Sequence, residues 1–209
     1  MPDQPLSFDL HNNEPILVVI SGPSGVGKDT VVKALLERED LSLHFVVTMT
    51  SRDPRPGEVN GKDYFFVSRE AFEGMIQRDE LLEYAKVYLD YKGIPKAQIR
   101  EAMNSHKDIL LRVNVQGAKT LRKICPEALM IFLMPSSREE WMDFLENRKT
   151  ENEESLTSRV DEIQYELSQV PEFDYVVVNA KDQLDKTVNI IASIIIAEHH
   201  RVNPRKVKL

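Results

Sequence analysis

Cysteine is nearly absent from this sequence of 209 residues, and it has no long apolar run. Because Cys125 is the only cysteine, an intrachain disulfide and a zinc site of several cysteines are excluded, and a reducing compartment is the mild inference. The longest apolar runs, at residues 16–20 and 190–197, fall well short of the roughly 18 residues that a membrane-spanning helix needs. We therefore expect no disulfide framework and no insertion into a membrane.

Basic residues are in the minority, at 27 against 34 acidic residues, which gives a net charge of −7. A protein that binds nucleic-acid polymers over a broad surface needs a basic excess, so we expect no such partner. A small anionic ligand stays open, because a local cluster of cations can oppose the overall sign. Hydrophobic residues, at 42%, suffice for a proper core, and 29% charged residues exclude a wholly disordered chain.

Short apolar stretches alternate with helical patterns along the chain. At about 150 residues per domain, the length fits one long domain or one domain with insertions. Apolar runs predict strands at residues 16–20, 45–48, 109–113, 129–134 and 175–178. Helical spacing predicts helices over residues 28–39, 117–124 and 183–198. This alternation predicts an α/β fold with a doubly wound parallel sheet.

Four stretches depart from the alternation. Residues 1–14 predict a disordered arm that resembles neither a signal nor a transit peptide; either the protein works where it is made, or a targeting segment has been removed. Residues 51–105, rich in turn signals, predict an inserted α+β subdomain, and the hydrophilic residues 147–160 a small mobile excursion. The core then comprises residues 15–50, 106–146 and 161–198, and residues 199–209 form a frayed basic tail.

The strongest motif is SGPSGVGKDT at residues 21–30, between a predicted buried strand and a helix. Gly22 and Gly27–Lys28 have the spacing of the phosphate-binding P-loop, in the context that this motif requires. Its glycines let several backbone N–H groups converge on one anion, and Lys28 adds a charge for the β- and γ-phosphates. A glycine-rich turn without function is the weaker interpretation.

The motif departs from its pattern directly after the lysine, where a Ser or Thr hydroxyl would serve Mg²⁺. Asp29 stands there, and a carboxylate beside polyphosphate is repulsive unless a cation intervenes. Either Asp29 binds a Mg²⁺-bound water, or Asp29 points away and Thr30 takes the metal role, directly or through a water.

A second candidate phosphate site follows at Arg52 and Arg55, which Pro54 and Pro56 stiffen. Two guanidinium forks with the nearby Tyr64 hydroxyl suit a phosphate monoester. Taken alone, the stretch is an ordinary solvated charged turn, since acidic residues interleave with the arginines. Beside a P-loop, a second phosphate site is what a phosphoryl acceptor needs.

These motifs carry a resemblance to guanylate kinases over residues 15 to about 198: SGPSGVGK, TSRDPRPGEVNGKDYFFV, LLEYA, VQGA, RKTENEES and VVVNA. The segments YKGIPKAQI, LRVNVQGA and FDYVVVNA resemble the plant plastid and mitochondrial type. The resemblance implies a P-loop nucleoside monophosphate kinase with a five-stranded parallel sheet, a GMP-binding insertion and a lid. It also implies Mg²⁺-dependent transfer of the γ-phosphoryl group of ATP to GMP or dGMP.

The resemblance further implies the site residues. Lys28 and the lid arginines Arg148 and Arg159 would be catalytic, with a closing lid that excludes water. The implied GMP site comprises Thr48, Arg52, Arg55, Glu58, Tyr64, Glu83 and Lys92. The implied ATP site comprises Gly22, Pro23, Ser24, Gly25, Val26, Gly27, Lys28, Asp29, Thr30, Arg148 and Asn179.

Without the resemblance, several of these residues have plainer interpretations. Glu83 would be a solvated helix residue, since Glu is rarely buried, and Asn179 an ordinary turn residue at a strand end. Arg148 and Arg159 would belong to an exposed helix of mixed charge. A carboxylate at position 83 nevertheless suits guanine, because it accepts from N1–H and the 2-amino group together, whereas adenine offers an acceptor at N1.

The chain also departs from the family pattern at four positions of the implied nucleotide site. Lys92 replaces a phosphate-binding tyrosine and keeps a cation, whereas Ile94 lacks a hydroxyl that contacts the nucleotide. Arg112 and Asn114 replace two carboxylates of the family, reversing one charge and neutralising the other. We expect GMP binding to persist, with an altered KM or a weaker organisation of Mg²⁺.

Two other functions stay open from the sequence: a catalytically weak guanylate-kinase-like module that binds a phosphate or phosphopeptide, and a kinase for another nucleoside monophosphate. Lys28 and the lid arginines argue against the first, and Glu83 against the second. We expect a monomer or weak homodimer that uses ATP and GMP. The resemblance implies a plastid or mitochondrion, with the cytoplasm as the alternative because no targeting segment is visible.

Overall fold

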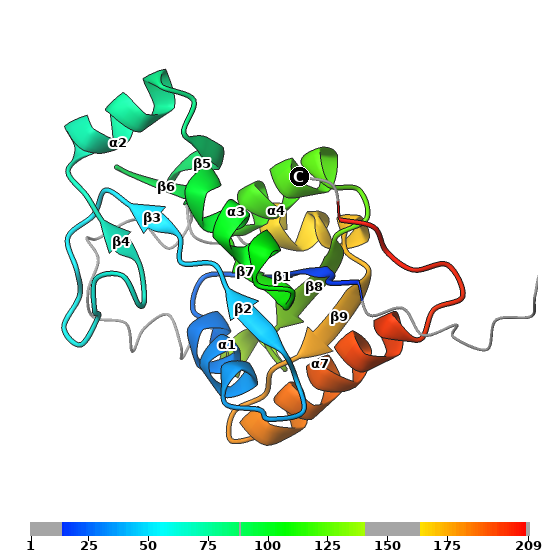
Figure 1. Cartoon of the computed structure of the whole chain (residues 1–209). Coiled ribbons are helices and arrows are strands. Elements are labelled where there is room, and N and C mark those ends of the chain that lie inside the picture. Colours follow the sequence, from blue (N-terminus) through cyan, green and yellow to red (C-terminus); the bar gives the residue numbers. More distant parts are fainter. Residues whose placement is uncertain (1–13, 88, 141–163, 208–209) are drawn as a thin grey trace, which may run out of the picture.

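The computed structural model describes residues 14–87, 89–140 and 164–207, and its main layer is a five-stranded sheet (Figure 1). All strand pairs in this sheet are parallel. In spatial order the strands are β2 (Leu43–Phe45), β7 (Asp108–Arg112), β1 (Leu17–Ser21), β8 (Leu129–Met134) and β9 (Tyr175–Val178). The predicted parallel α/β core is confirmed.

Helices cover both faces of this sheet because the central strand is apolar on both sides. Val18 and Ile20 of β1 pack in the cluster that includes α1 (Lys28–Leu36) and α7 (Leu184–His199). Leu17 and Val19 alternate to the other face, where the cluster includes α3 (Lys96–Asn104) and α4 (Val115–Ile124). Every residue of β1 is buried, as expected for the inner strand of a parallel sheet.

A second, four-stranded sheet lies to one side of the main sheet (Figure 1). Its strands, in spatial order, are β4 (Phe65–Phe66), β3 (Met49–Thr50), β6 (Asp90–Pro95) and β5 (Leu81–Val87). Phe72 of α2 (Arg69–Gln77) packs with Met49 and Leu81 in a small core of its own. A 3-10 helix, η1 (Val170–Glu172), precedes β9.

The bounds of the inserted unit differ from the sequence pattern. The small sheet already begins at β3, ahead of residue 51, whereas α3 contributes Ile99 and Ala102 to the core of the main sheet. The second predicted strand is present, but its bounds of 45–48 are wrong, because β2 spans Leu43–Phe45 and the chain then crosses to the second sheet. Val46 and Thr48 are buried in that crossing, so an apolar pattern there does not reveal a change of partner.

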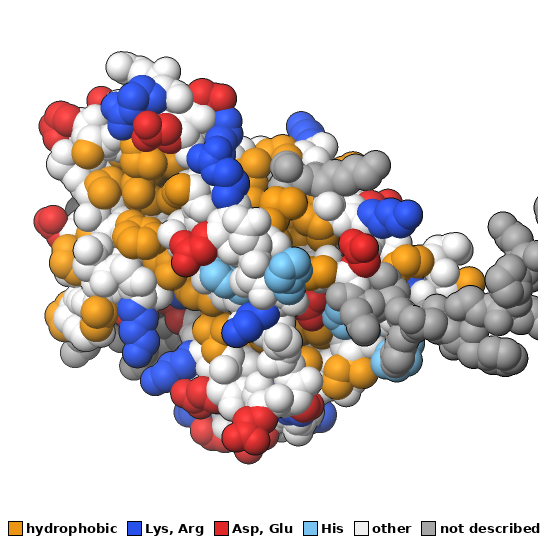
Figure 2. All heavy atoms as spheres, viewed as in Figure 1, with side chains coloured by type: hydrophobic (Ala, Val, Ile, Leu, Met, Phe, Trp, Pro, Cys, Tyr) orange, Lys and Arg blue, Asp and Glu red, His pale blue; other side chains and the backbone are white. Residues whose placement is uncertain are grey.

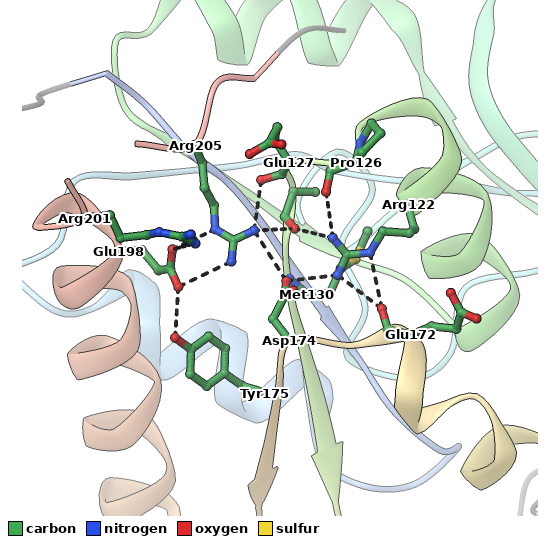
Figure 3. Close-up of polar contacts among 11 residues, drawn as sticks. Arg122, Pro126, Glu127, Met130, Glu172, Asp174, Tyr175, Glu198, Arg201 and Arg205 are labelled. Atoms are coloured by element: carbon green, nitrogen blue, oxygen red, sulfur yellow. Dashed lines mark hydrogen bonds and ion pairs between the residues drawn. The ribbon is translucent and has the colours of Figure 1, made fainter. Parts of the chain in front are cut away.

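Two further predictions need correction. Glu83 lies in strand β5 and is buried, so its placement on a solvated helix is wrong. The tail from residue 199 is not frayed where the structure describes it. His199 ends α7, and Arg205 is buried, donating to Glu198 Oε2 at 2.7 Å and to the carbonyl of Ala128 at 3.2 Å (Figure 3). The predicted arm at residues 1–14, apart from Glu14, and the lid at 147–160 fall outside the described residues.

On the face shown in Figure 2, Lys and Arg side chains lie interspersed with Asp and Glu side chains. Of the helices that the structure describes, none has both the length and the apolar character needed to cross a bilayer.

Candidate functional site

A cleft of about 450 Å³ lies between the carboxyl ends of β1 and β7 and the small sheet. This volume suits a small-molecule site, and the ends of parallel strands are where α/β sheets bind ligands. Seven of the P-loop residues line it: Gly22, Ser24, Gly25, Gly27, Lys28, Asp29 and Thr30. Six of the seven residues predicted to bind GMP line it too: Thr48, Arg52, Arg55, Tyr64, Glu83 and Lys92.

The P-loop follows β1 and ends at the first turn of α1. Gly22 has φ 141°, and a Cβ there would lie 2.3 Å from the carbonyl oxygen of Leu133, so no side chain fits. Lys28 Nζ donates to the carbonyls of Gly22 and Pro23 at 2.7 and 2.8 Å. The lysine therefore folds back over its own loop, next to the helix N-terminus that attracts anions.

Four predicted ATP-site residues do not line the cleft or lie outside the described residues: Pro23, Val26, Asn179 and Arg148. Neither Pro23 nor Val26 lines the cleft: the side chain of Val26 is buried in the main core, and its backbone N–H donates to the carbonyl of Pro23 at 3.3 Å. Asn179 Nδ2 donates to the carbonyl of Val26 at 2.8 Å, which holds the loop from behind. Arg148 lies outside the described residues, as does Arg159 of the catalytic set.

The two-arginine turn is organised by Glu58. Arg52 makes a fork with its carboxylate, through bonds of 2.7 and 2.6 Å, and the backbone N–H of Arg55 donates to the same carboxylate at 2.7 Å. Partial burial acts to raise the pKa of Glu58, but the bonds from Arg52 and Arg55 outweigh it and hold the pKa below its usual value. Glu58 is not among the residues lining the cleft, so the geometry makes it a counter-ion to the arginines.

Cations surround the ring of Tyr64. The guanidinium carbons of Arg52 and Arg112 lie 5.1 and 4.6 Å from its centroid, and Lys92 Nζ lies 5.7 Å from it. Burial, together with Arg52 and the other nearby cations, lowers the pKa of Lys92 to about 8. This concentration of positive charge suits a phosphate dianion, and its lysine is the one that replaces the tyrosine of the family pattern.

The cleft also holds a buried acid, on strand β5. Glu83 is 6% exposed, its Oε1 has no hydrogen-bond partner among the described residues, and burial raises the pKa of its carboxyl to about 7. Thr48, also 6% exposed, lines the same cleft. A buried acceptor without a partner indicates a ligand that donates hydrogen bonds.

Asn114 keeps a structural role in place of the carboxylate of the family pattern. Its Oδ1 accepts from the N–H of Gly117 at 2.8 Å and caps α4. A Cβ on Gly117 would lie 3.3 Å from both carboxylate oxygens of Glu83. The start of α4 therefore fixes the wall against which the buried acid stands.

Asp29 and Arg112, two residues whose charge departs from the motif pattern, contact each other in the structure. Arg112 and Asp29 form an ion pair across the cleft, although 83 residues separate them in sequence. The sequence left Asp29 with two roles, and the structure gives it a third, as partner of a guanidinium. The sequence placed Arg112 in the nucleotide site as a departure from the family pattern but gave it no role. Asp90, Tyr165 and Glu166 also line the cleft, and no local pattern in the sequence indicated them.

No group of three or more His, Cys, Asp or Glu side chains that could hold a metal occurs in the described part of the chain. Mg²⁺ is commonly held by one or two protein oxygens together with substrate phosphates and water. Asp29 and Thr30 line the cleft at the P-loop, so the residues present fit an ion that arrives with a nucleotide.

Comparison with known proteins shows which family the chain resembles. A family model described as guanylate kinase matches residues 14–198. The chain is 52% identical over 197 residues to the rice (Oryza sativa subsp. japonica) protein named guanylate kinase 2, chloroplastic/mitochondrial, covering 94% of this chain and 69% of that one. It is 44% identical over 192 residues to a guanylate kinase of Caldanaerobacter subterraneus subsp. tengcongensis, covering 91% of each. The crystal structure of guanylate kinase from Anaplasma phagocytophilum superposes with a TM-score of 0.73 at 29% identity, covering 92% and 90% of the two chains.

Proposed function

The chain belongs to the guanylate kinase family, and on that premise we propose that it transfers the γ-phosphoryl group of ATP to GMP, giving ADP and GDP. One observation carries the proposal: a single cleft joins a P-loop to a second cationic site and to a buried acid that lacks a partner. A donor phosphate, an acceptor phosphate and a guanine would meet these three features in turn. dGMP is a further acceptor, because none of the three requires the ribose 2′-hydroxyl.

Glu83 supports guanine as the acceptor base. As a carboxylate it accepts from N1–H and the 2-amino group at once, whereas adenine has an acceptor at N1 and no 2-amino group. A bidentate match of this kind discriminates by about 1–3 kcal/mol. Thr48 lines the same cleft and would contact the guanine, while Arg52, Arg55, Tyr64 and Lys92, which also line it, would hold the phosphate of GMP. Glu58 acts through the arginines that it holds.

Phosphoryl transfer depends on alignment and on cations more than on covalent chemistry. The P-loop N–H groups and Lys28 would bind the donor phosphates, with Arg148 and Arg159 closing from the lid. Asn179 would act from behind by holding the loop, next to the adenine side. Mg²⁺ bound with ATP would neutralise charge on its phosphates, and Thr30 or Asp29, which line the cleft at the P-loop, would hold it directly or through water.

A coupled assay with ATP and each of GMP, AMP, CMP and dTMP tests the proposal. We expect turnover with GMP and a preference over AMP of about tenfold or more. Lys28→Met should abolish turnover yet keep GMP binding in calorimetry, with the exposed Lys33→Met as the matched control. Absence of turnover with all four acceptors would contradict the proposal and favour a phosphate- or phosphopeptide-binding module.

We also propose an organellar setting, in a plastid or mitochondrion, with the rice relative's name as its support. Bacterial relatives match nearly as closely, so the cytoplasm is the alternative. Fractionation of the source tissue, with detection of a longer precursor, tests this point. Sedimentation at several concentrations tests the proposed monomer or weak homodimer.

A further inference from the structure

Arg112 is the last residue of β7, and it lies at the junction of the two halves of the cleft. One terminal nitrogen of its guanidinium pairs with Asp29 of the P-loop helix, and the other donates to the carbonyl of Asp63 at 2.9 Å. Asp63 belongs to the segment that leads into the small sheet. The side chain of Arg112 therefore links the P-loop side of the cleft, where ATP would bind, to the side where GMP would bind.

The surroundings of Arg112 fix its orientation. The side chain is 7% exposed, and its guanidinium carbon lies 4.6 Å from the ring centroid of Tyr64 and 5.6 Å from that of Phe45. The two neighbouring rings and the two hydrogen bonds leave the planar group little freedom, and a planar fork loses little entropy in such a site. Asp29, with its side chain 58% exposed, offsets one of the charges gathered around Tyr64.

The two tethers leave donors for a ligand. A guanidinium has five N–H groups, and the bonds to Asp29 and Asp63 require only two of them. A phosphate oxygen that enters between the P-loop and Tyr64 can thus bond to Arg112 with both tethers intact. Because the group is already oriented, its charge is in place before charge develops during transfer.

We propose that Arg112, held by Asp29, is a phosphate-positioning residue that aligns the phosphate of GMP with the γ-phosphate of ATP. This inference rests on the proposed function and adds a residue that the motifs do not assign to either substrate. Arg52, Arg55 and Tyr64 bind GMP whether or not ATP is present, whereas Arg112 acts in the ternary complex. Its loss should therefore lower kcat far more than it weakens GMP binding.

The first experiment compares Arg112→Gln with Arg100→Gln, which removes the same charge from an exposed position on α3. For Arg112→Gln we expect kcat to fall by about 100-fold, with the GMP dissociation constant in calorimetry changed by less than about threefold. Arg112→Lys keeps the charge without the fork, so it should recover about a tenth of kcat or less. Arg100→Gln should match the wild type in both measurements.

A merely structural role predicts another result. If Arg112→Gln lowers the melting temperature but leaves the kcat of the folded enzyme within about threefold of wild type, the inference is overturned. A loss in GMP affinity equal to the loss in kcat overturns it as well, because Arg112 would then be an ordinary GMP ligand. Circular dichroism of each variant establishes that the folded enzyme is being compared.

A double-mutant cycle tests the role of Asp29. Asp29→Asn should lower kcat by about tenfold by releasing the guanidinium, and the double variant Asp29→Asn/Arg112→Gln should be no slower than Arg112→Gln alone. If the two losses multiply, Asp29 does not act through Arg112, and that part of the inference is wrong.

If the proposed function itself is wrong, the wild type and Arg100→Gln will also show no turnover with GMP. This result is distinct from one in which only the role of Arg112 is wrong. Where turnover is absent, the coupling between GMP and a non-hydrolysable β,γ-imido analogue of ATP, which keeps the γ-phosphate, tests Arg112 directly in calorimetry. The inference requires that GMP tightens binding of the analogue in the wild type and that Arg112→Gln removes the effect; coupling that is absent from the wild type or unchanged in the variant overturns it.

Discussion

Glu83 shows how a single side chain can serve binding at the expense of stability. Burial raises the pKa of its carboxyl from an ordinary 4.5 to about 7. The folded state therefore binds the proton more tightly than the unfolded state, and stability from this group is lost as the pH rises from 4.5 toward 7. Above about pH 7 the enzyme carries the full cost of a buried carboxylate whose Oε1 lacks a described partner.

Glu83→Gln should therefore stabilise the protein at alkaline pH. We expect the free energy of unfolding to rise by about 1–2 kcal/mol at pH 8, and the gain to vanish near pH 5, in urea denaturation at both pH values. The exposed Glu39→Gln is the matched control and should show no such pH-dependent gain. A variant no more stable than wild type at pH 8 would show that the carboxylate is compensated in the free enzyme.

The pH dependence of kcat/KM for GMP reports two groups of the free enzyme. Guanine recognition needs Glu83 ionised, so the parameter should fall below about pH 7. Phosphate binding needs Lys92 protonated. Burial and the nearby arginines lower the pKa of Lys92 to about 8, although Asp29 acts to raise it, so kcat/KM should fall above about pH 8. Lys92→Arg should extend the plateau to higher pH, and an unchanged alkaline limb would assign it to another group.

At the scale of elements, the start of α4 supports the guanine end of the cleft. A Cβ at Gly117 would lie 3.1 Å from Asn114 Oδ1 and 3.3 Å from both oxygens of Glu83, closer than side chains normally approach. Gly117→Ala should push the carboxylate out of place and raise the KM for GMP by about tenfold, a loss of about 1.4 kcal/mol in binding. The KM for ATP should stay unchanged, and a steady-state assay that finds both values unaltered would show that Glu83 can give way.

The sequence predicted the elements whose apolar residues form continuous runs and missed those whose function breaks the pattern. Strands β8 and β9 were predicted to the residue, because both are apolar throughout, β8 as a buried strand and β9 as an edge strand with Val176 and Val178 exposed. Strand β5 was missed because Glu83 occupies one of its inward positions, where periodicity expects an apolar residue. The P-loop was found from local spacing, whereas the pairing of Asp29 with Arg112 spans 83 residues and leaves no local signal.

At the scale of the whole molecule, the C-terminal segment is held to the core by Arg205 (Figure 3), and none of its partners lines the cleft. Glu198 in α7 is 4% exposed and accepts from Arg205 Nε at 2.7 Å and from the hydroxyl of Tyr175 at 2.9 Å. Arg205 also donates to the carbonyls of Glu127 and Ala128, just before β8. One side chain thus joins the last helix, the approach to a central strand and the chain terminus.

Removing Arg205 leaves Glu198 buried with a weaker set of partners, so Arg205→Met should lower the free energy of unfolding by about 2–4 kcal/mol. Arg201 is the matched control: it pairs with the same carboxylate at 3.1 Å, but 46% of its side chain is exposed. Arg201→Met should therefore cost at most about 1 kcal/mol. Because neither arginine lines the cleft, kcat and KM at 25 °C should be unchanged in both variants. If urea denaturation shows equally small losses of unfolding free energy in the two variants, the buried Arg205–Glu198 pair is worth no more than the exposed Arg201–Glu198 pair. The terminal segment would then add no stability beyond a surface contact.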